Sequence, residues 1–176
     1  LGAGIRGSAP ALSLRDNLII HAHRRSARGF WGTFGLMDRA YLDRWIGAVM
    51  RTARLPPTPE AASSSFSGGM LQRAALAREF AENADLLVLA EPGWGLDRSS
   101  RDALRGELRD YARGGRAVLV FSTDTEELIA LADEIRVLRN GFFSGGIVLA
   151  PGPRDDPALV RSLTDRIGRL MVGAHG

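Results

Sequence analysis

The sequence predicts an α/β fold that carries a small helical lobe. Between residues 86 and 149, short apolar runs typical of strands alternate with segments of helical periodicity. Strand–helix–strand alternation favours parallel pairing through right-handed crossovers. The first third of the chain shows helical periodicity throughout. We therefore expect residues 1–82 to form a helical subdomain, and residues 83–176 to form part of an α/β core that ends in a helix.

The composition fits a chain with one compact core. Its 176 residues are 45% hydrophobic, and folding at this length buries roughly two-thirds of the unfolded surface. All 23 basic residues are arginine, the formal net charge is +3, and cysteine is absent, which excludes disulfides and thiol chemistry. The chain starts at Leu1 with neither a signal-like segment nor an apolar run of membrane-spanning length. We expect a soluble chain that is truncated at its N-terminus.

Two helices are predicted before residue 60. Ser13 can cap a helix over residues 14–23, with Asp16 placed as in a capping box. A second helix is predicted over residues 38–54, and the proline-rich segment 55–59 ends it. Its predicted apolar stripe consists of Tyr41, Trp45, Ala48 and Val49.

The remaining elements follow a Ser-Gly-Gly turn at residues 67–69, which opens a third helix over 70–82. Residues 86–90 and 117–121 are short continuous apolar runs, predicted to be strands buried on both faces. Asn140-Gly141 is a strong hairpin signal. The other predicted elements are helices over 98–113, 125–132 and 155–172 and strands over 135–138 and 142–149.

Two features of this pattern carry chemistry. A Ser hydroxyl, two glycines and the free N–H groups of a helix start form an anion site, although the same residues also make an ordinary helix cap. The strand over 86–90 delivers Glu91 to its C-terminal end, where ligands bind in open α/β sheets. Phosphate binding at the turn and carboxylate chemistry at Glu91 are therefore the candidate functions.

The order of these motifs resembles the ATP-binding cassette (ABC) ATPases. The family's signature motif is matched by Phe66, Ser67, Gly68, Gly69 and Met70. Its Walker B strand is matched by residues 86–92, and its D-loop by Gly95, Leu96 and Asp97. The resemblance implies a partial RecA-like P-loop NTPase core with a helical subdomain that ends in the signature helix. It also implies ATP and Mg²⁺ in the intact assembly, with the signature contacting ATP held by the opposite subunit.

The chain departs from the family pattern at three places. Ala90 stands where the family has the Asp that organises the Mg²⁺ shell, while Glu91 keeps the catalytic general-base position. Thr123 stands at the switch position, where the family has His. A phosphate loop needs a lysine, and this chain has none. The isolated chain is therefore expected to hold neither nucleotide nor metal, and whether it is an enzyme stays open.

Two further segments resemble one subfamily. Residues 13–18, SLRDNL, and the ending 165–173 are similar to the second cassette of simple-sugar and nucleoside importer ATPases. This resemblance implies a subunit that couples ATP hydrolysis to import of a sugar- or nucleoside-like solute. Its implied partners are a second cassette, in a dimer or in tandem, and membrane permease subunits, which places it in the cytoplasm at the membrane periphery.

Other functions remain open from the sequence. A degenerate cassette could act as a non-catalytic structural or regulatory partner. An ABC ATPase associated with nucleic acid is a weaker alternative, suggested by basic and aromatic residues that lie close together in residues 24–31. Because the overall charge is only mildly positive, a solvated loop is the favoured interpretation and no nucleic-acid partner is expected. His21, His23 and His175 show no metal-ligand spacing.

Overall fold

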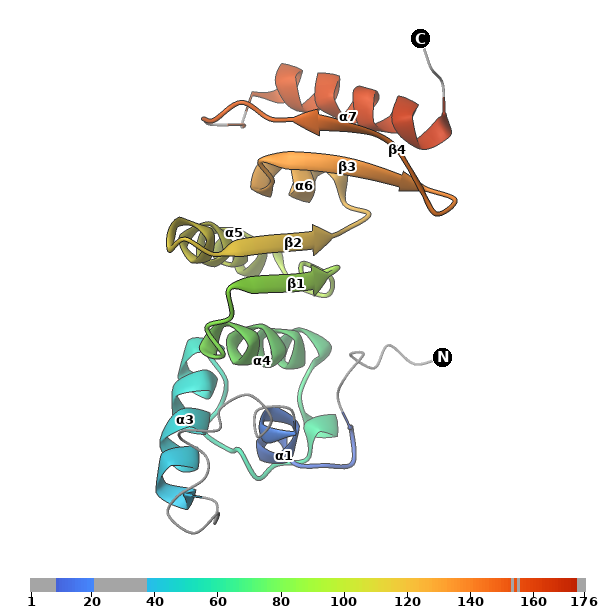
Figure 1. Ribbon diagram of the computed structural model, residues 1–176. Coiled ribbons are helices and arrows are strands. Elements are labelled where there is room, and N and C mark those ends of the chain that lie inside the picture. The colour runs from blue at the N-terminus through green and yellow to red at the C-terminus, as the bar shows by residue number, and fades with distance from the viewer. Residues whose placement is uncertain (1–8, 21–37, 153, 155, 174–176) are drawn as a thin grey trace. The chain divides into compact units, whose positions relative to one another are not determined.

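The computed structural model describes residues 9–20, 38–152, 154 and 156–173 (Figure 1). The chain splits into two compact units. Unit 1 comprises residues 1–87 and 94–99, and unit 2 comprises residues 88–93 and 100–176. The division into domains 1–82 and 83–176 stays a prediction. The aromatic loop near residue 30 and all three histidines lie outside the described residues.

The mixture of helices and strands confirms the predicted α/β class. Among the described residues, none of the helices has both the length and the apolar character that crossing a membrane requires. The elements in chain order are α1 (Leu14–Ile19), α3 (Arg39–Thr52), the 3₁₀ helix η2 (Ser63–Ser65), α4 (Gly68–Ala81), β1 (Leu86–Ala90), α5 (Arg98–Arg113), β2 (Ala117–Phe121), α6 (Thr125–Leu131), β3 (Glu134–Arg139), β4 (Phe142–Val148) and α7 (Pro157–Val172).

The core of unit 1 is formed by α1, α3 and α4. Its buried side chains are Leu14, Leu18, Leu42, Ile46, Val49, Met50, Ala53, Ala74 and Ala77. Of the stripe predicted for α3, Val49 is buried as expected, but the other three positions are not. Tyr41 and Trp45 are only partly buried at the edge of this core, and Ala48 is exposed. The aliphatic residues one position further on face the core, because large aromatic rings with a polar atom are well suited to its rim.

Asn17 is a buried polar residue that ties α1 to the segment preceding α4. Its side chain is 6% exposed. Its Oδ1 accepts the N–H of Ala9 at 2.7 Å, and its Nδ2 donates to Ser63 Oγ at 2.7 Å. Ser63 is itself fully buried, and its N–H donates to the Leu12 carbonyl at 2.9 Å. In addition, Arg78 of α4 donates to the Asn17 carbonyl at 3.1 Å. Asn17 thus contacts the segment before α1 through Ala9, the 3₁₀ helix η2 through Ser63, and α4 through Arg78.

Arg15 adds a more exposed link in the same unit. Its guanidinium donates to Asp43 of α3 at 2.6 Å and to Glu60 at 3.3 Å. The hydrogen bond to Asp43 raises the pKa of the guanidinium above its ordinary value. Both carboxylates are exposed, so these pairs contribute little to stability.

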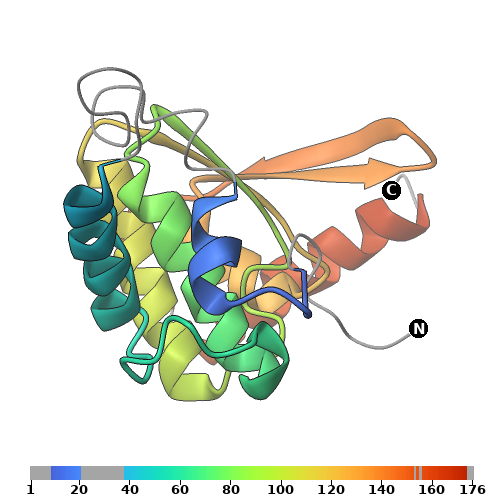
Figure 2. The ribbon, with the colours of Figure 1, turned by 90° about the horizontal axis from the view of Figure 1, so that it is seen from below.

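Unit 2 contains a β-hairpin covered by helices. β3 and β4 pair antiparallel with an irregularity between Val137 and Leu138. The turn residues Asn140 and Gly141 have φ values of 50° and 83°, the conformation that a two-residue hairpin turn requires. The hairpin prediction is therefore confirmed. α7 lies along this hairpin (Figures 1 and 2) and packs with α6 onto its inner face, where Ile129, Ile135, Val137, Ile147, Leu149 and Ile167 are buried.

β1 and β2 are hydrogen-bonded neighbours, and their arrows point the same way in Figure 1. Their predicted bounds are confirmed, but the prediction that both faces are buried is wrong. Leu87 and Leu89 are buried, whereas Val88 is 54% exposed. On β2, Leu119 and Phe121 are exposed. A continuous apolar run indicates a strand with two apolar faces, and here the second face stays open to solvent.

We expect Asn17→Ala to lower the free energy of unfolding by about 1–3 kcal/mol, because it leaves the buried Ser63 hydroxyl and the Ala9 N–H without their partner. Urea denaturation followed by circular dichroism measures the change. Ser65→Ala is the matched control, because the Ser65 hydroxyl bonds the Ala62 carbonyl at an exposed position, where the loss should stay within about 0.5 kcal/mol. Equal small losses in both variants would show that the Asn17 bonds do not hold unit 1 together.

Candidate functional site

The N-terminus of α4 carries the predicted signature residues. Ser67 is the N-cap, with φ −66° and ψ 156°, and its Oγ accepts the N–H of Met70 at 3.3 Å. The helix begins at Gly68, two residues earlier than predicted. Gly68 and Gly69 are therefore the first residues of the helix and do not form a separate turn. The cause is the serine cap, which fixes the first turn before the glycines can leave helical geometry.

The two glycines of this turn differ in their surroundings. A Cβ on Gly68 would meet no heavy atom within 4 Å. A Cβ on Gly69 would lie 3.0 Å from the carbonyl oxygen of Gly95. The structure therefore brings the predicted D-loop residue Gly95 against the signature helix within unit 1. Ser67 and Gly68 are exposed, while Phe66 packs against the core of the unit.

The D-loop segment itself turns sharply. Gly95 has φ 74°, a conformation that favours glycine. Leu96 is buried at 5% exposure and anchors the segment, whereas Asp97 is exposed and directly precedes α5. The anchor and the left-handed glycine together hold the Gly95 carbonyl next to Gly69.

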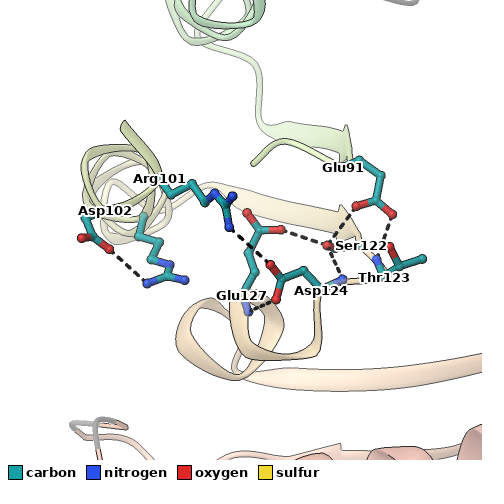
Figure 3. A network of polar contacts seen from close by, with 8 residues as sticks. Glu91, Arg101, Asp102, Ser122, Thr123, Asp124 and Glu127 are labelled. Carbon is teal, nitrogen blue, oxygen red and sulfur yellow. Dashed lines mark hydrogen bonds and ion pairs between the residues drawn. The ribbon is translucent and has the colours of Figure 1, made fainter. Parts of the chain in front are cut away.

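Glu91 lies at the end of β1 in unit 2 and is held from three sides (Figure 3). Its N–H donates to the Phe121 carbonyl at 2.7 Å. Its Oε1 accepts the N–H of Thr123 at 2.8 Å, and its Oε2 lies 3.2 Å from Ser122 Oγ. The backbone of Glu91 has φ 48°, a left-handed conformation that costs a non-glycine residue about 1 kcal/mol or more. The contacts with the end of β2 keep the residue in that conformation.

Thr123, the predicted switch position, contacts Glu91 through its backbone. The N–H of Thr123 holds the Glu91 carboxylate, and the residue is exposed. Because any residue other than proline supplies this N–H, the contact does not depend on a histidine or a threonine side chain. The structure thus brings Glu91 and residue 123 together.

Two residues near Glu91, Ser122 and Glu127, were not among the functional residues predicted from the sequence. Ser122 Oγ lies 2.9 Å from Oε2 of Glu127, which is 3% exposed. Asp124 caps α6, its Oδ1 accepting the N–H of Glu127 at 3.0 Å, and its own N–H donates to Ser122 Oγ at 3.1 Å. The available signal was Asp124 with Glu127 three residues later, the spacing of a capping box. Here the glutamate side chain turns to Ser122 instead (Figure 3).

The charge around Ser122 is mainly negative. Two carboxylates, those of Glu91 and Glu127, contact its hydroxyl, and the nearby Asp124 carboxylate accepts the N–H of Glu127 (Figure 3). Arg101 of α5 reaches Asp124 at 3.8 Å, and both of these side chains are 43% exposed. Arg101 therefore lies on the solvent-exposed side of the group formed by Ser122 and the neighbouring carboxylates. Glu127 lies on the buried side of the same group.

The residues at the end of β1 do not fit a Mg²⁺ ion. Ala90, the position of the family's magnesium-organising aspartate, has no oxygen on its side chain. Within the described ranges, no group of three or more His, Cys, Asp or Glu side chains could hold a metal. The start of α4 does fit an anion, because it joins an exposed hydroxyl with helix N–H groups and an open glycine.

The chain is similar in sequence to ATP-binding proteins of sugar importers. It is 34% identical over 136 residues to the arabinose import ATP-binding protein AraG of Chromohalobacter salexigens, covering 77% of the chain and 27% of the relative. It is 31% identical over 149 residues to AraG of Azospirillum brasilense, covering 85% and 28%. No protein-family model matches the chain.

A solved structure confirms the fold. An inward-facing metal-chelate type ABC transporter superposes with a TM-score of 0.61 at 24% identity, covering 80% of this chain and 54% of that one. The chain spans about a quarter of the length of the curated relatives, 27% and 28% in the two cases above. Sequence relatives and fold agree, and the chain belongs to the family of ABC transporter ATP-binding proteins, where its relatives are ATP-binding proteins of sugar importers.

Proposed function

We propose that the chain is part of the ATP-binding subunit of an ABC importer that takes up a sugar- or nucleoside-like solute. The observation that carries the proposal is the match to arabinose import ATP-binding proteins over 77% and 85% of the chain. That aligned region is large enough to include both the signature helix and the Glu91 cluster. Sugar uptake is favoured over nucleoside uptake because both of these relatives are named for arabinose.

The signature turn is proposed to contact the γ-phosphate of ATP bound by another cassette. Ser67 and Gly68 are exposed at the first turn of α4. A helix N-terminus carries a partial positive charge and free N–H donors, which favour phosphate. The open space at Gly68 lets a phosphate oxygen approach the backbone without meeting a side chain.

Glu91 is proposed to be the remaining catalytic carboxylate of a weakened ATP site. It can accept a hydrogen from an attacking water, which is the role of a general base. The neighbouring Ala90 offers no metal ligand, and Thr123 contributes a backbone N–H instead of an imidazole. ATP and Mg²⁺ would therefore be held mainly by other parts of the assembly.

The proposed roles of the signature residues and of the chain in import imply two kinds of partner subunit. A signature that acts on another cassette's ATP requires a second cassette, either in a dimer or in tandem. Import requires membrane permease subunits, which would hold the chain at the cytoplasmic side of the membrane. A non-catalytic cassette that only supports a competent partner is the second candidate, and Ala90 is the observation that favours it.

Gly68→Asp should lower ATP turnover of the whole assembly by about a hundredfold or more, because it places a carboxylate where a transition-state phosphate is stabilised. An acidic residue in the first turn does not weaken the helix itself. Glu91→Gln should leave most of the turnover. Steady-state phosphate release and ATP-driven arabinose uptake, measured in proteoliposomes holding the chain with its cassette partner and permease, check both results.

Gly106→Asp provides the matched control for that change. Gly106 is an exposed glycine in the middle of α5, and a Cβ there also meets nothing within 4 Å. This variant should keep near-normal turnover. If Glu91→Gln were the inactive variant and Gly68→Asp stayed active, the site built on β1 would be the working site, and the proposed roles of the signature and of Glu91 would be wrong.

The isolated chain should not bind Mg-ATP more tightly than about millimolar, because phosphate binding in P-loop enzymes depends on a lysine and electrostatic positioning, and this chain has no lysine. Isothermal titration calorimetry measures the affinity. A submicromolar dissociation constant would require a phosphate site other than the signature turn and would count against the proposed function.

A further inference from the structure

The Ser122 hydroxyl has one hydrogen, but two carboxylate oxygens lie within hydrogen-bonding distance of its oxygen. A serine hydroxyl donates one hydrogen and accepts at two lone pairs. The N–H of Asp124 already donates to Ser122 Oγ at 3.1 Å. Two carboxylate oxygens also lie within bonding distance, Glu127 Oε2 at 2.9 Å and Glu91 Oε2 at 3.2 Å. Since carboxylate oxygens accept, the two glutamates compete for a single hydroxyl hydrogen.

Burial decides this competition in favour of Glu127. Its side chain is 3% exposed, and Ser122 Oγ is the partner that the structure gives its Oε2. Glu91 is only half-buried and also accepts the N–H of Thr123. Leaving a buried charged acceptor without a donor costs more than leaving one that water reaches. The shorter of the two distances agrees with this order.

We propose that Glu127 is a positioning residue for Glu91, and that it acts by taking the hydroxyl hydrogen of Ser122. Glu91 Oε2 then faces an oxygen lone pair and stays free to accept a hydrogen from another molecule. Oε1 stays fixed by the Thr123 N–H at 2.8 Å. Oε2 is therefore the atom of Glu91 that accepts a proton, an assignment that rests on the proposed role of Glu91 as a general base.

The geometry holds Glu127 firmly enough for this task. Its backbone N–H is capped by Asp124 Oδ1 at 3.0 Å. On the other side, a Cβ on Gly93 would clash with Oε1 of Glu127, so a side chain at position 93 would have to displace this carboxylate. The carboxylate is thus confined between the loop that follows Glu91 and the hydroxyl of Ser122, and the two glutamates are linked through both.

A mutant cycle on the 176-residue chain tests the assignment without ATP. The unfolding equilibrium constant in urea is measured for the parent chain, Glu91→Ala, Ser122→Ala and the double variant, and then for the same four in a Glu127→Gln background. The amide that Glu127→Gln introduces can donate to Ser122 Oγ, and this turns the hydroxyl hydrogen toward Glu91. The quantity compared is the coupling between positions 91 and 122. It is the factor by which the effect of Glu91→Ala on the unfolding equilibrium constant changes when Ser122→Ala is also present.

The coupling should be close to onefold in the parent background and rise to about tenfold in the Glu127→Gln background, because a hydrogen bond to a charged acceptor then forms. Thr123→Ala replaces Ser122→Ala as the control, and its coupling to Glu91 should stay near onefold in both backgrounds, since the contact is made by the backbone. A merely structural role of Glu127 would lower stability without changing the coupling.

A strong coupling of positions 91 and 122 in the parent chain, with no rise in the Glu127→Gln background, would overturn the proposal. If Ser122→Ala does not fold, Ser122→Cys runs the same cycle with a weaker donor of similar shape. These outcomes are independent of the proposed importer function, which the phosphate-release and uptake measurements test separately.

Discussion

The joint between the ends of β1 and β2 is the constraint on which the site in unit 2 depends. The N–H of Glu91 bonds the Phe121 carbonyl, and its carboxylate reaches Ser122 and Thr123. This joint fixes where β1 stops, keeps Glu91 in a left-handed conformation and sets the start of the turn into α6. Catalytic groups need a placement within a fraction of an ångström. Two of these three contacts use backbone groups, the N–H of Glu91 and the N–H of Thr123, so the placement tolerates a change of side chain at residue 123.

In unit 1, a buried side-chain amide, that of Asn17, holds the segment before α4 in place. Asn17 and Ser63 satisfy each other away from water, and they hold the chain just before the serine cap of α4. Each unit has a buried polar side chain that contacts the segment next to its proposed functional residues. These side chains are Asn17, which bonds Ser63 in unit 1, and Glu127, which contacts Ser122 in unit 2. Buried polar groups of this kind favour one arrangement strongly, because each alternative leaves a donor or acceptor unpaired.

The sequence predicted the elements better than their surroundings. The bounds of β1, α5 and β2 and the hairpin turn at Asn140 agree with the structure, because periodicity and turn chemistry are local. The phase of the α3 stripe and the open faces of the strands depend on which neighbours pack there, and composition does not encode that. The partnership of Ser122 and Glu127 was missed for the same reason. A capping pattern shows that a glutamate is available, but not where its side chain turns.

The open apolar face of the strands has a practical consequence. Val88, Leu119 and Phe121 present apolar surface to solvent in the folded chain. Environment-sensitive dyes such as those used in thermal-shift screening fluoresce on contact with surface of this kind, so the native protein would already give a high signal. Melting curves recorded with these dyes would start from an elevated baseline and hide the transition. Circular dichroism, which follows the backbone, avoids this interference and is the appropriate reporter for every variant of this chain.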